Sequence, residues 1–473
     1  MKSGKHIAAN EGFALAFGLF LGLCLLKFGN PVILDRDIYP PVSFSEYWTD
    51  AWPTDWANCF LVPLAAIGAI LIVRLPASKR PRLPRWLLVL PLLWLGWQLI
   101  SAAQTVDPTL TAFTLWQFFG CVACYFIGAF LFGGARALHF LLAGILIAFV
   151  FCLIQAVHQH IEFPLDEKFL LEGQRTGWTN FPPASVLEMK RDHTIITTNG
   201  ADIANPAILA KFAKGRVMGT MIYPNALAGI ILLLFPVSFA LALNGAKTLR
   251  PAVGYAAIAL TAVLAGGAFF WSGSKFGWLI ALLMILLCLC RLQWPLQLKI
   301  SALALVVILG MGIFAIRFHS YFAHGATSTT ARFDYWRAAV QTACSHPLLG
   351  TGPGTFQRPY AKLKSPEAEM ARLAHNDYLE QFSDSGFPGG IFYATWVVAA
   401  LAFASQRLWK SRDLAAVALF LGLLGWFVQG LGEFGLFIPA LAWIAFTFLG
   451  CAPALNDAEG TAPESIRQKG NHD

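Results

Sequence analysis

A polar stretch, residues 331–390, interrupts a chain that is otherwise almost entirely apolar. It combines arginines, a histidine, and amide, phenol and carboxyl side chains, namely Arg332, Arg337, Arg372, His375, Asn376, Tyr378 and Glu380. Guanidinium groups bind phosphate oxygens through charge-assisted hydrogen bonds, and an imidazole titrates near neutral pH, so it can accept a proton from a hydroxyl group. These residue types predict a site that binds an anion and activates an acceptor.

A helix is predicted over residues 331–344 because apolar side chains recur there at helical spacing. They are Phe333, Trp336, Val340 and Cys344, and their face is expected to lie against the membrane or the protein. Thr329 or Thr330 can cap the start of this helix, and Pro347 ends the segment. The helix carries Arg332 and Arg337.

A second helix is predicted to start with Ser365 as its cap and Pro366 as its first residue, and to stop near Gly386. Spacings of three and four residues place four side chains on one face of it, namely Arg372, His375, Asn376 and Leu379. Between the two helices, the glycines at 350, 352 and 354 allow the backbone to approach an anion, and a plain turn is an equally good interpretation.

The composition of the whole chain shows where these helices belong. Hydrophobic residues make up 57% of the 473 residues and charged residues only 13%, which is too apolar for a soluble globular protein. A membrane-spanning helix needs about 20 mostly apolar residues. Twelve such segments are centred near residues 20, 65, 95, 122, 147, 230, 261, 283, 308, 396, 422 and 443; the one near 283 is short, so eleven spans remain an alternative. The predicted fold class is an all-α polytopic membrane protein with twelve transmembrane helices.

The net charge of +8 reflects topology, because the basic residues lie mostly on one side of the spans. Fifteen of them fall on one side, in clusters at residues 2–5, 74–85, 136, 247–250, 291–299 and 407–412, whereas the short segments on the other side hold only Lys27, Arg36 and Lys275. By the positive-inside rule both termini are cytoplasmic. This distribution gives no indication of nucleic-acid binding.

The spans and the polar segments between them divide the chain into six parts. Two long polar segments are external: residues 158–214, here the first polar segment, and residues 317–388, here the second polar segment. Residues 1–157 hold spans one to five, residues 215–316 spans six to nine, and residues 389–451 spans ten to twelve. Residues 452–473 form a polar cytoplasmic tail. The first polar segment shows no pattern from which a fold can be predicted.

Two more cations lie at span ends. Arg216 is at the edge of the sixth span, where Pro224 and Asn225 would bend the helix and let Arg216 face a site; anchoring in lipid headgroups is the alternative. Lys275, in an external turn, could bind phosphate as a point charge or anchor the membrane interface.

Other features carry weaker predictions. Asp35 and Asp37 flank Arg36 beyond the first span and could hold a divalent cation, although a solvated turn is the more ordinary interpretation. Cys121 and Cys124 form a C-x-x-C pair inside a span, without a histidine or a second pair, which favours apolar packing. The basic and apolar start of the chain lacks a convincing cleavage site, which favours an uncleaved first span.

The spans carry ionisable residues only at their ends, for example Glu11, Lys27 and Glu433. Ion-coupled transporters need such groups within the membrane, so transport is disfavoured. The polar chemistry is external, where nucleotides are not expected. A reaction there must use an already activated substrate, and a lipid-linked pyrophosphate provides one.

Four segments together resemble a known family. They are R-V-M-G-T-M-I-Y-P-N at 216–225, A-R-F-D-Y-W at 331–336, H-P-L-L-G-T-G-P-G-T-F at 346–356, and H-N-D-Y-L with the following G-F-P-G-G at 375–390. In order and placement they resemble the O-antigen ligase and polymerase superfamily of integral membrane glycosyltransferases, over the C-terminal two-thirds of the chain. The resemblance implies a GT-C-like fold in the bacterial inner membrane, with a periplasmic active site.

The resemblance also implies a reaction: transfer of a glycan from undecaprenyl pyrophosphate to an acceptor hydroxyl, without a nucleotide and, in the ligases, without a metal or other cofactor. Arg216 and Arg332 would bind the pyrophosphate, and His375 would act as base or orient the acceptor. Substrate-binding roles are expected for Asn225, Lys275, Arg337, Arg372, Asn376 and Tyr378. The acceptor could be lipid A core, a growing polysaccharide or a protein, which correspond to a ligase, a polymerase and a protein O-oligosaccharyltransferase. A lipid-glycan flippase or exporter is the alternative from another class.

Overall fold

The computed structural model describes residues 2–77, 80–198, 200–246, 251–323 and 327–455. Within these residues the chain is almost wholly helical, with a single two-stranded sheet, which confirms the all-α fold class. Most of the predicted tail, residues 456–473, lies outside the described residues, as do Lys79, Lys247 and Arg250 of the cytoplasmic clusters.

A helix occupies each of the twelve predicted apolar segments. They are α1 (Lys2–Lys27), α3 (Thr54–Val73), α4 (Arg85–Ala102), α5 (Pro108–Leu131), α6 (Ala135–Thr176), α9 (Pro224–Ala246), α10 (Pro251–Ser272), α11 (Lys275–Arg291), α12 (Leu296–Ala323), α15 (Asp377–Leu408), α16 (Leu414–Gln429) and α17 (Pro439–Ala454). Nine helices of the described residues are long and apolar enough to cross a membrane, whereas α11, α16 and α17 have only 16 or 17 residues.

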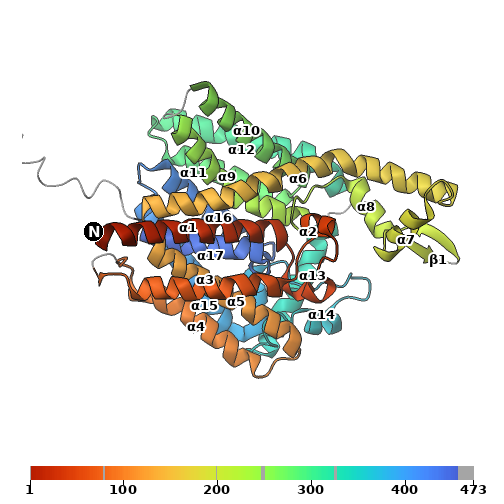
Figure 1. The fold of residues 1–473 in the computed structure, drawn as a ribbon, viewed down its shortest axis with the longest axis horizontal. Helices are drawn as coiled ribbons and strands as arrows, with labels where there is room; N and C mark the ends of the chain where they lie inside the picture. The colour runs from red at the N-terminus through yellow and green to blue at the C-terminus, as the bar shows by residue number, and fades with distance from the viewer. Residues whose placement is uncertain (1, 78–79, 199, 247–250, 324–326, 456–473) are drawn as a thin grey trace, which may run out of the picture.

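The centre of the bundle is α17, all of whose residues are buried. Figure 1 shows α1, α16 and α17 running side by side through the middle of the molecule. Glycines allow the closest contacts: a Cβ on Gly18 of α1 would collide with the backbone of Leu141 in α6, and one on Gly450 of α17 with the backbone of Tyr125 in α5. Small residues at helix contacts are typical of membrane bundles, because they let the backbones approach.

The first polar segment begins as helix, because α6 continues to Thr176 and so contains residues 158–176. At 1.5 Å per residue its 42 residues extend about 63 Å, roughly twice the thickness of the hydrocarbon core. Beyond it lie α7 (Pro183–Arg191), the antiparallel strands β1 (Ile195–Thr198) and β2 (Ala201–Ala204), and α8 (Pro206–Lys214). Figure 1 shows this part projecting from one end of the bundle.

The second polar segment contains α13 (Thr327–Ser345) and α14 (Gln357–Leu363). The predicted helix over 331–344 is confirmed, but it begins at Thr327, so neither Thr329 nor Thr330 caps it. Its predicted apolar face does not lie against the protein, because Phe333 and Val340 are 60% and 48% exposed, and contact of that face with the membrane stays a prediction. The buried face is the neighbouring one, formed by Tyr335, Ala338, Ala339, Thr342 and Ala343.

The predicted helix starting at Ser365 was also wrong, because α15 starts only at Asp377. Asn376 is its cap: the Asn376 side-chain oxygen accepts hydrogen bonds from the backbone N–H groups of Tyr378 and Leu379, at 3.1 and 3.0 Å. Asparagine caps a helix as well as serine does, and acidic residues in the first turn favour this start. The predicted break near Gly386 is confirmed, since Ser385 and Gly386 have non-helical backbone angles within α15.

The segment after α1 contains a short 3-10 helix, η1 (Val32–Asp37), and α2 (Phe44–Thr49). The Asp35 carboxylate accepts a hydrogen bond from Thr54 N at 2.6 Å, and the Asp37 carboxylate pairs with Arg372 at 2.7 Å. The two carboxylates thus have separate protein partners, and the described residues contain no group of His, Cys, Asp and Glu arranged to hold a metal ion.

Candidate active site

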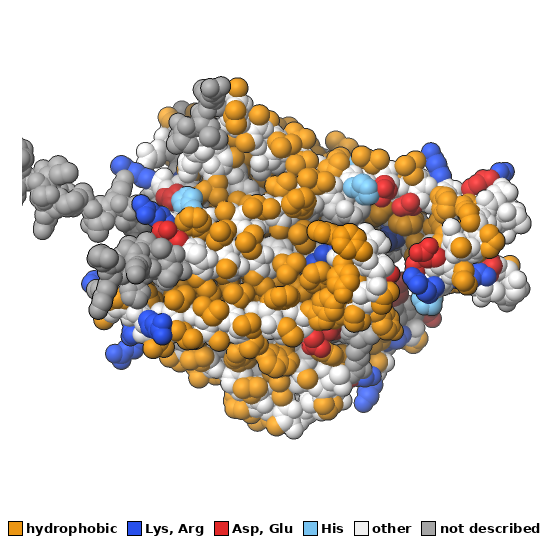
Figure 2. Space-filling view, viewed as in Figure 1, with side chains coloured by type: hydrophobic (Ala, Val, Ile, Leu, Met, Phe, Trp, Pro, Cys, Tyr) orange, Lys and Arg blue, Asp and Glu red, His pale blue; other side chains and the backbone are white. Residues whose placement is uncertain are grey.

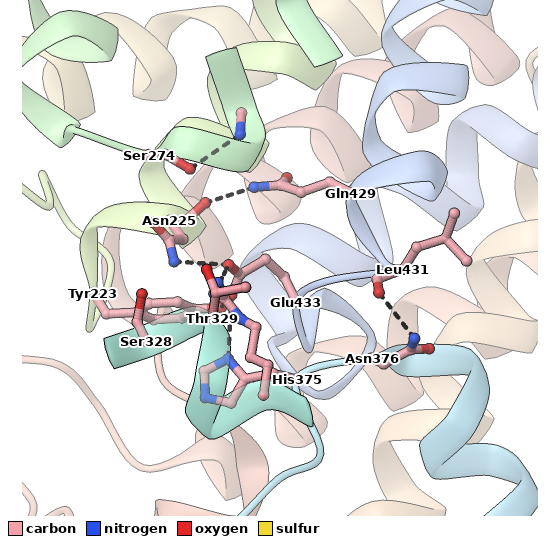
Figure 3. Close-up of polar contacts among 12 residues, drawn as sticks. Tyr223, Asn225, Ser274, Ser328, Thr329, His375, Asn376, Gln429, Leu431 and Glu433 are labelled. Atoms are coloured by element: carbon pink, nitrogen blue, oxygen red, sulfur yellow. Dashed lines mark hydrogen bonds and ion pairs between the residues drawn. The ribbon is translucent and has the colours of Figure 1, made fainter. Parts of the chain in front are cut away.

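A buried carboxylate, Glu433, contacts four side chains from three separate segments. Its Oε1 atom accepts hydrogen bonds from Arg332 Nη2 at 2.5 Å and from Asn225 Nδ2 at 2.7 Å. On the other oxygen, Tyr223 donates its hydroxyl to Oε2 at 3.2 Å, and His375 Nδ1 lies 3.4 Å away. Figure 3 shows Tyr223, Asn225 and His375 converging on Glu433. The carboxylate therefore has one oxygen toward an arginine and the other toward the histidine.

Arg216 joins this cluster through Asn225. Arg216 Nη2 donates to Asn225 Oδ1 at 2.8 Å, and Arg216 Nε donates to the carbonyl of Ser272 at 2.7 Å. The predicted proline bend was wrong, because Pro224 is the first residue of α9, a position where proline is tolerated without distortion. Arg216 instead reaches the site from the irregular segment before α9.

Cations outnumber acids here. The charges of Arg332 and Arg317 act on Arg216, and the charges of all three arginines act on Lys275 at the start of α11. The Nζ atom of Lys275 lies 3.7 Å from the centre of the Tyr321 ring. Burial lowers the pKa of Arg216, and the nearby arginines lower it further, while Glu433 opposes the shift. In the described part of the chain, Glu433 is the acid that pairs with this group, so a bound anion would relieve the repulsion between the cations.

Glu433 is held in its ionised form. Burial alone would raise its pKa, but the nearby His375 imidazole and the Arg332 charge, with the Tyr223 hydroxyl, hold the pKa below its ordinary value. It is only 3% exposed. An ionised, buried carboxylate orients the donors around it strongly, because the local dielectric is low.

His375 has an unusual backbone conformation, with a φ of +52°. A non-glycine residue in the left-handed region costs of order 1–3 kcal/mol and often marks a functional site. The ring lies near Tyr335 and Phe434, with centroid distances of 5.8 and 4.6 Å, and the side chain is 27% exposed. Since Nδ1 faces Glu433, Nε2 is the nitrogen available to a substrate.

The residues after His375 form hydrogen bonds with the loop that carries Glu433. Asn376 Nδ2 donates to the Leu431 carbonyl at 2.8 Å, and Asp377 N donates to the carbonyl of Gly430 at 2.7 Å. The Asp377 carboxylate accepts the N–H of Leu436, in the 3-10 helix η3 (Gly435–Phe437), at 3.2 Å. Tyr378 donates its hydroxyl to the Phe427 carbonyl at 3.1 Å. Asn376 and Tyr378 thus have structural partners, and their substrate contacts stay a prediction.

Arg337 and Arg372, which were predicted to bind substrate, form ion pairs with acids other than Glu433. Arg337 pairs with Asp334 at 2.5 Å and Arg372 with Asp37 at 2.7 Å, and both arginine side chains are at least half exposed. The turn at glycines 350, 352 and 354 approaches a carboxyl group of the protein itself: Gly354 N donates to Asp384 Oδ2 at 2.7 Å. A substrate role for Arg337 and Arg372 stays a prediction.

A cavity of about 600 Å³, almost entirely apolar, opens between the helices below the cluster. It is lined from α9, α10, α11 and α16 by residues that include Phe235, Phe239, Phe269, Met284 and Val417. The first α9 residue in its wall, Ile231, follows Asn225 by six residues, which is about 9 Å along a helix. The cluster and the apolar cavity therefore share the same helices.

Sequence reasoning missed Glu433 and Tyr223 as site residues. A signal for Glu433 was present, because it is the only charged residue between positions 414 and 454. An isolated ionisable residue in an apolar region indicates a functional site. For Tyr223 only its place between Arg216 and Asn225 was informative.

Comparison with known proteins identifies one family model that matches part of the chain. Residues 260–394 match the family model described as O-antigen ligase, a range that contains Lys275, Arg332 and His375 but neither Arg216 nor Glu433. No curated protein matches the chain. The matched domain, over residues 260–394, and the all-α membrane fold support the O-antigen ligase and polymerase superfamily, a class of membrane glycosyltransferases.

Proposed function

We propose that this protein transfers a glycan from undecaprenyl pyrophosphate to an acceptor hydroxyl, as an O-antigen ligase does. The observation that carries the proposal is the Glu433 cluster: Arg332 pairs with this carboxylate beside His375, Arg216 joins it through Asn225, and the charge of Lys275 lies near both arginines. A guanidinium group can donate two parallel hydrogen bonds to pyrophosphate oxygens, and a lysine ammonium group adds a compact positive charge. The excess of cations supports a doubly charged donor.

The apolar cavity supports a lipid as the carrier of that pyrophosphate. It runs along α9, α11 and α16, from Ile231 toward Arg291 and Leu414 at the opposite helix ends. Asn225 and Lys275 lie in the first turns of α9 and α11, so a headgroup at the cluster would leave its isoprenoid chain near the Ile231 end of the cavity. Burial of isoprenoid carbon in an apolar cavity is favourable by roughly 25 cal/mol per Å² of apolar surface removed from water. A free nucleotide sugar has no group that would use this cavity.

The proposed step is a displacement at the anomeric carbon of the donor sugar. The acceptor oxygen forms a bond to that carbon as its proton passes to His375 Nε2, and the bond from carbon to pyrophosphate oxygen breaks. Arg216 and Arg332 stabilise the charge that develops on the departing undecaprenyl pyrophosphate. Glu433, whose Oε2 lies 3.4 Å from His375 Nδ1, stabilises the imidazolium that forms.

The membrane orientation is part of the proposal. Figure 2 shows a largely apolar face of the bundle, with Lys and Arg side chains at the end where the N-terminus lies and others on and near the projecting part at the opposite end. The cluster is at the opposite ends of the helices, near the projecting first polar segment. By the positive-inside rule, both termini are then cytoplasmic and the site faces the periplasm of the bacterial inner membrane.

The acceptor separates the related functions. A ligase would use lipid A core, a polymerase a growing glycan, and a protein O-oligosaccharyltransferase a protein hydroxyl. The glycan profile of a deletion strain distinguishes them: a ligase leaves long lipid-linked chains, a polymerase single repeats, and a protein glycosylation enzyme lost glycoforms. A flippase or exporter would instead leave unmodified donor on the cytoplasmic leaflet.

The transfer step itself is tested with purified protein and a lipid pyrophosphate donor. His375→Ala should remain folded and lose transfer by at least about 100-fold, since general-base catalysis contributes roughly 10²–10⁴-fold. His193→Ala is the matched control, because His193 also has a positive φ, of 55°, but lies in the first polar segment. Transfer by His375→Ala at the rate of His193→Ala would refute the proposed base.

A further inference from the structure

Two buried acids lie one turn apart at the start of α15. Glu380 and Asp384 are both fully buried, and among the described residues no Lys, Arg or His forms an ion pair with either. Burying a carboxylate without a cation is costly, so its remaining contacts must account for it. Each acid accepts a hydrogen bond from a backbone N–H group in a different part of the second polar segment.

Glu380 hydrogen-bonds to Ala374, the residue before His375. Its Oε2 atom accepts the backbone N–H of Ala374 at 3.0 Å, and Ala374 is itself fully buried. The next residue, His375, has the left-handed backbone described above, and the carbonyl of His375 accepts a hydrogen bond from Trp336 Nε1 at 3.4 Å. The strained peptide is thus held on its upstream side by Glu380.

Asp384 instead hydrogen-bonds to the turn that contains Gly350, Gly352 and Gly354. Its Oδ2 atom accepts Gly354 N–H at 2.7 Å, 21 positions away from His375 in the chain. The second carboxyl oxygen of each acid, Glu380 Oε1 and Asp384 Oδ1, is buried and makes no hydrogen bond. The two acids therefore match in helix, burial and type of contact, and differ in what they hold.

We propose that Glu380 is a positioning residue for His375: by holding Ala374 N–H it fixes the left-handed backbone that directs the imidazole toward Glu433. This inference rests on the proposed function for its effect on turnover, but not for its effect on the imidazole. Glu380→Ala frees the peptide, whereas Glu380→Gln keeps an oxygen that can accept the same N–H. Asp384→Ala leaves the His375 peptide held.

The direct test is the rate at which diethyl pyrocarbonate modifies His375, measured by mass spectrometry of the purified protein, with His158 as an internal reference. Glu380→Ala should change the His375 rate at least 3-fold, whereas Glu380→Gln and Asp384→Ala should keep it within 2-fold of wild type. An unchanged His375 rate in Glu380→Ala overturns the inference, and so does an equal change in Asp384→Ala. This readout holds whether or not the protein transfers glycans.

Turnover gives the second readout. A misplacement of about 1 Å costs up to roughly 100-fold in rate, so Glu380→Ala should lower kcat by 10- to 100-fold while KM for the lipid donor stays within 2-fold. If Glu380→Ala does not fold, Glu380→Asp, which is one methylene too short, takes its place in both assays. A loss of kcat in Glu380→Ala no greater than in Asp384→Ala, per folded protein, would show a merely structural role.

Discussion

The two polar segments between the spans fold in different ways. The first folds mainly on itself: Leu170, Trp178, Ile195 and Ala204 form a small core of their own, and Lys190 pairs with Asp202 of the same segment at 2.6 Å. The second folds onto the bundle: Arg332 pairs with Glu433, and Arg358 with Asp107, each across more than 100 positions of sequence.

The difference shows what makes a polar segment into a site. These contacts give most of the first segment a core of its own in the projecting part, although Gln159 near its start hydrogen-bonds Met218 and Gly219 outside the segment. In the second segment, Arg332 and His375 meet their partner only because α9, α13, α15 and the loop after α16 come together. Chemistry is therefore expected where polar groups depend on distant segments.

The largest effect is expected for Glu433→Gln. The change leaves Arg332 without its counter-ion in a buried position, and breaking a buried pair costs about 3–5 kcal/mol. We expect a clear fall in the thermal unfolding temperature and at least about 100-fold less transfer. Asp202→Asn, which breaks the partly exposed pair in the first segment, should cost only about 0–1 kcal/mol. Equal effects of the two changes would contradict the contrast between the segments.

The second test compares the small cores of the two segments. Trp178→Ala and Tyr360→Ala each remove a buried aromatic ring, which costs about 3–5 kcal/mol locally. The Tyr360 core includes Tyr335 of α13 and Ala374 next to His375, so Tyr360→Ala should lower transfer about 10-fold or more. Trp178→Ala should make the first segment sensitive to proteolysis and leave donor binding unchanged. Loss of donor binding in Trp178→Ala would show that the segments are coupled.

The third test uses pH. The pKa of Glu433 is lower in the folded protein than its ordinary value of 4.5. The stability it contributes is therefore fully present above pH 4.5 and is lost as pH falls through the folded pKa. Thermal unfolding of the wild type should show this acid-dependent loss, and Glu433→Gln should lack that part of it. Parallel curves for the two proteins would argue against an ionised Glu433.

The smallest effects are expected for Arg337→Ala and Arg372→Ala. Both arginines are at least half exposed and pair with acids away from Glu433. Exposed pairs contribute about 0–1 kcal/mol, so unfolding and transfer should stay within about 2-fold of wild type. A loss of transfer above 10-fold with normal stability would restore their predicted role in substrate binding.

Local patterns were sufficient for most of the fold. Each of the twelve helices follows from a run of apolar residues, and the break near Gly386 from glycine and proline. Errors arose where two local signals competed: Ser365 and Asn376 are both good caps, and packing of the Ala371 and Ala374 side chains selected the second. The choice between the two faces of α13 likewise depended on neighbours far along the chain.

The site was only partly predictable for the same reason. Arg216, Arg332 and His375 stand out by residue type, and the structure brings all three to Glu433. The role of Glu433 is not local, because it depends on a loop 58 positions after His375 in the chain. Arg337 and Arg372 have the same side chain as Arg332, and only the folded structure shows that Arg332 alone of the three pairs with Glu433.

In the proposed reaction, Arg216 and Arg332, which come from different segments, bind one pyrophosphate. Binding of undecaprenyl pyrophosphate to purified protein tests it most directly, in wild type, Arg216→Ala, Arg332→Ala and the double variant. Hydrogen bonds to charged groups contribute about 1.5–3 kcal/mol, so each single variant should bind roughly 10- to 100-fold more weakly. Because both arginines act at the Glu433 cluster, the double variant should bind more tightly than independent effects predict. Wild-type affinity in either single variant would contradict the account.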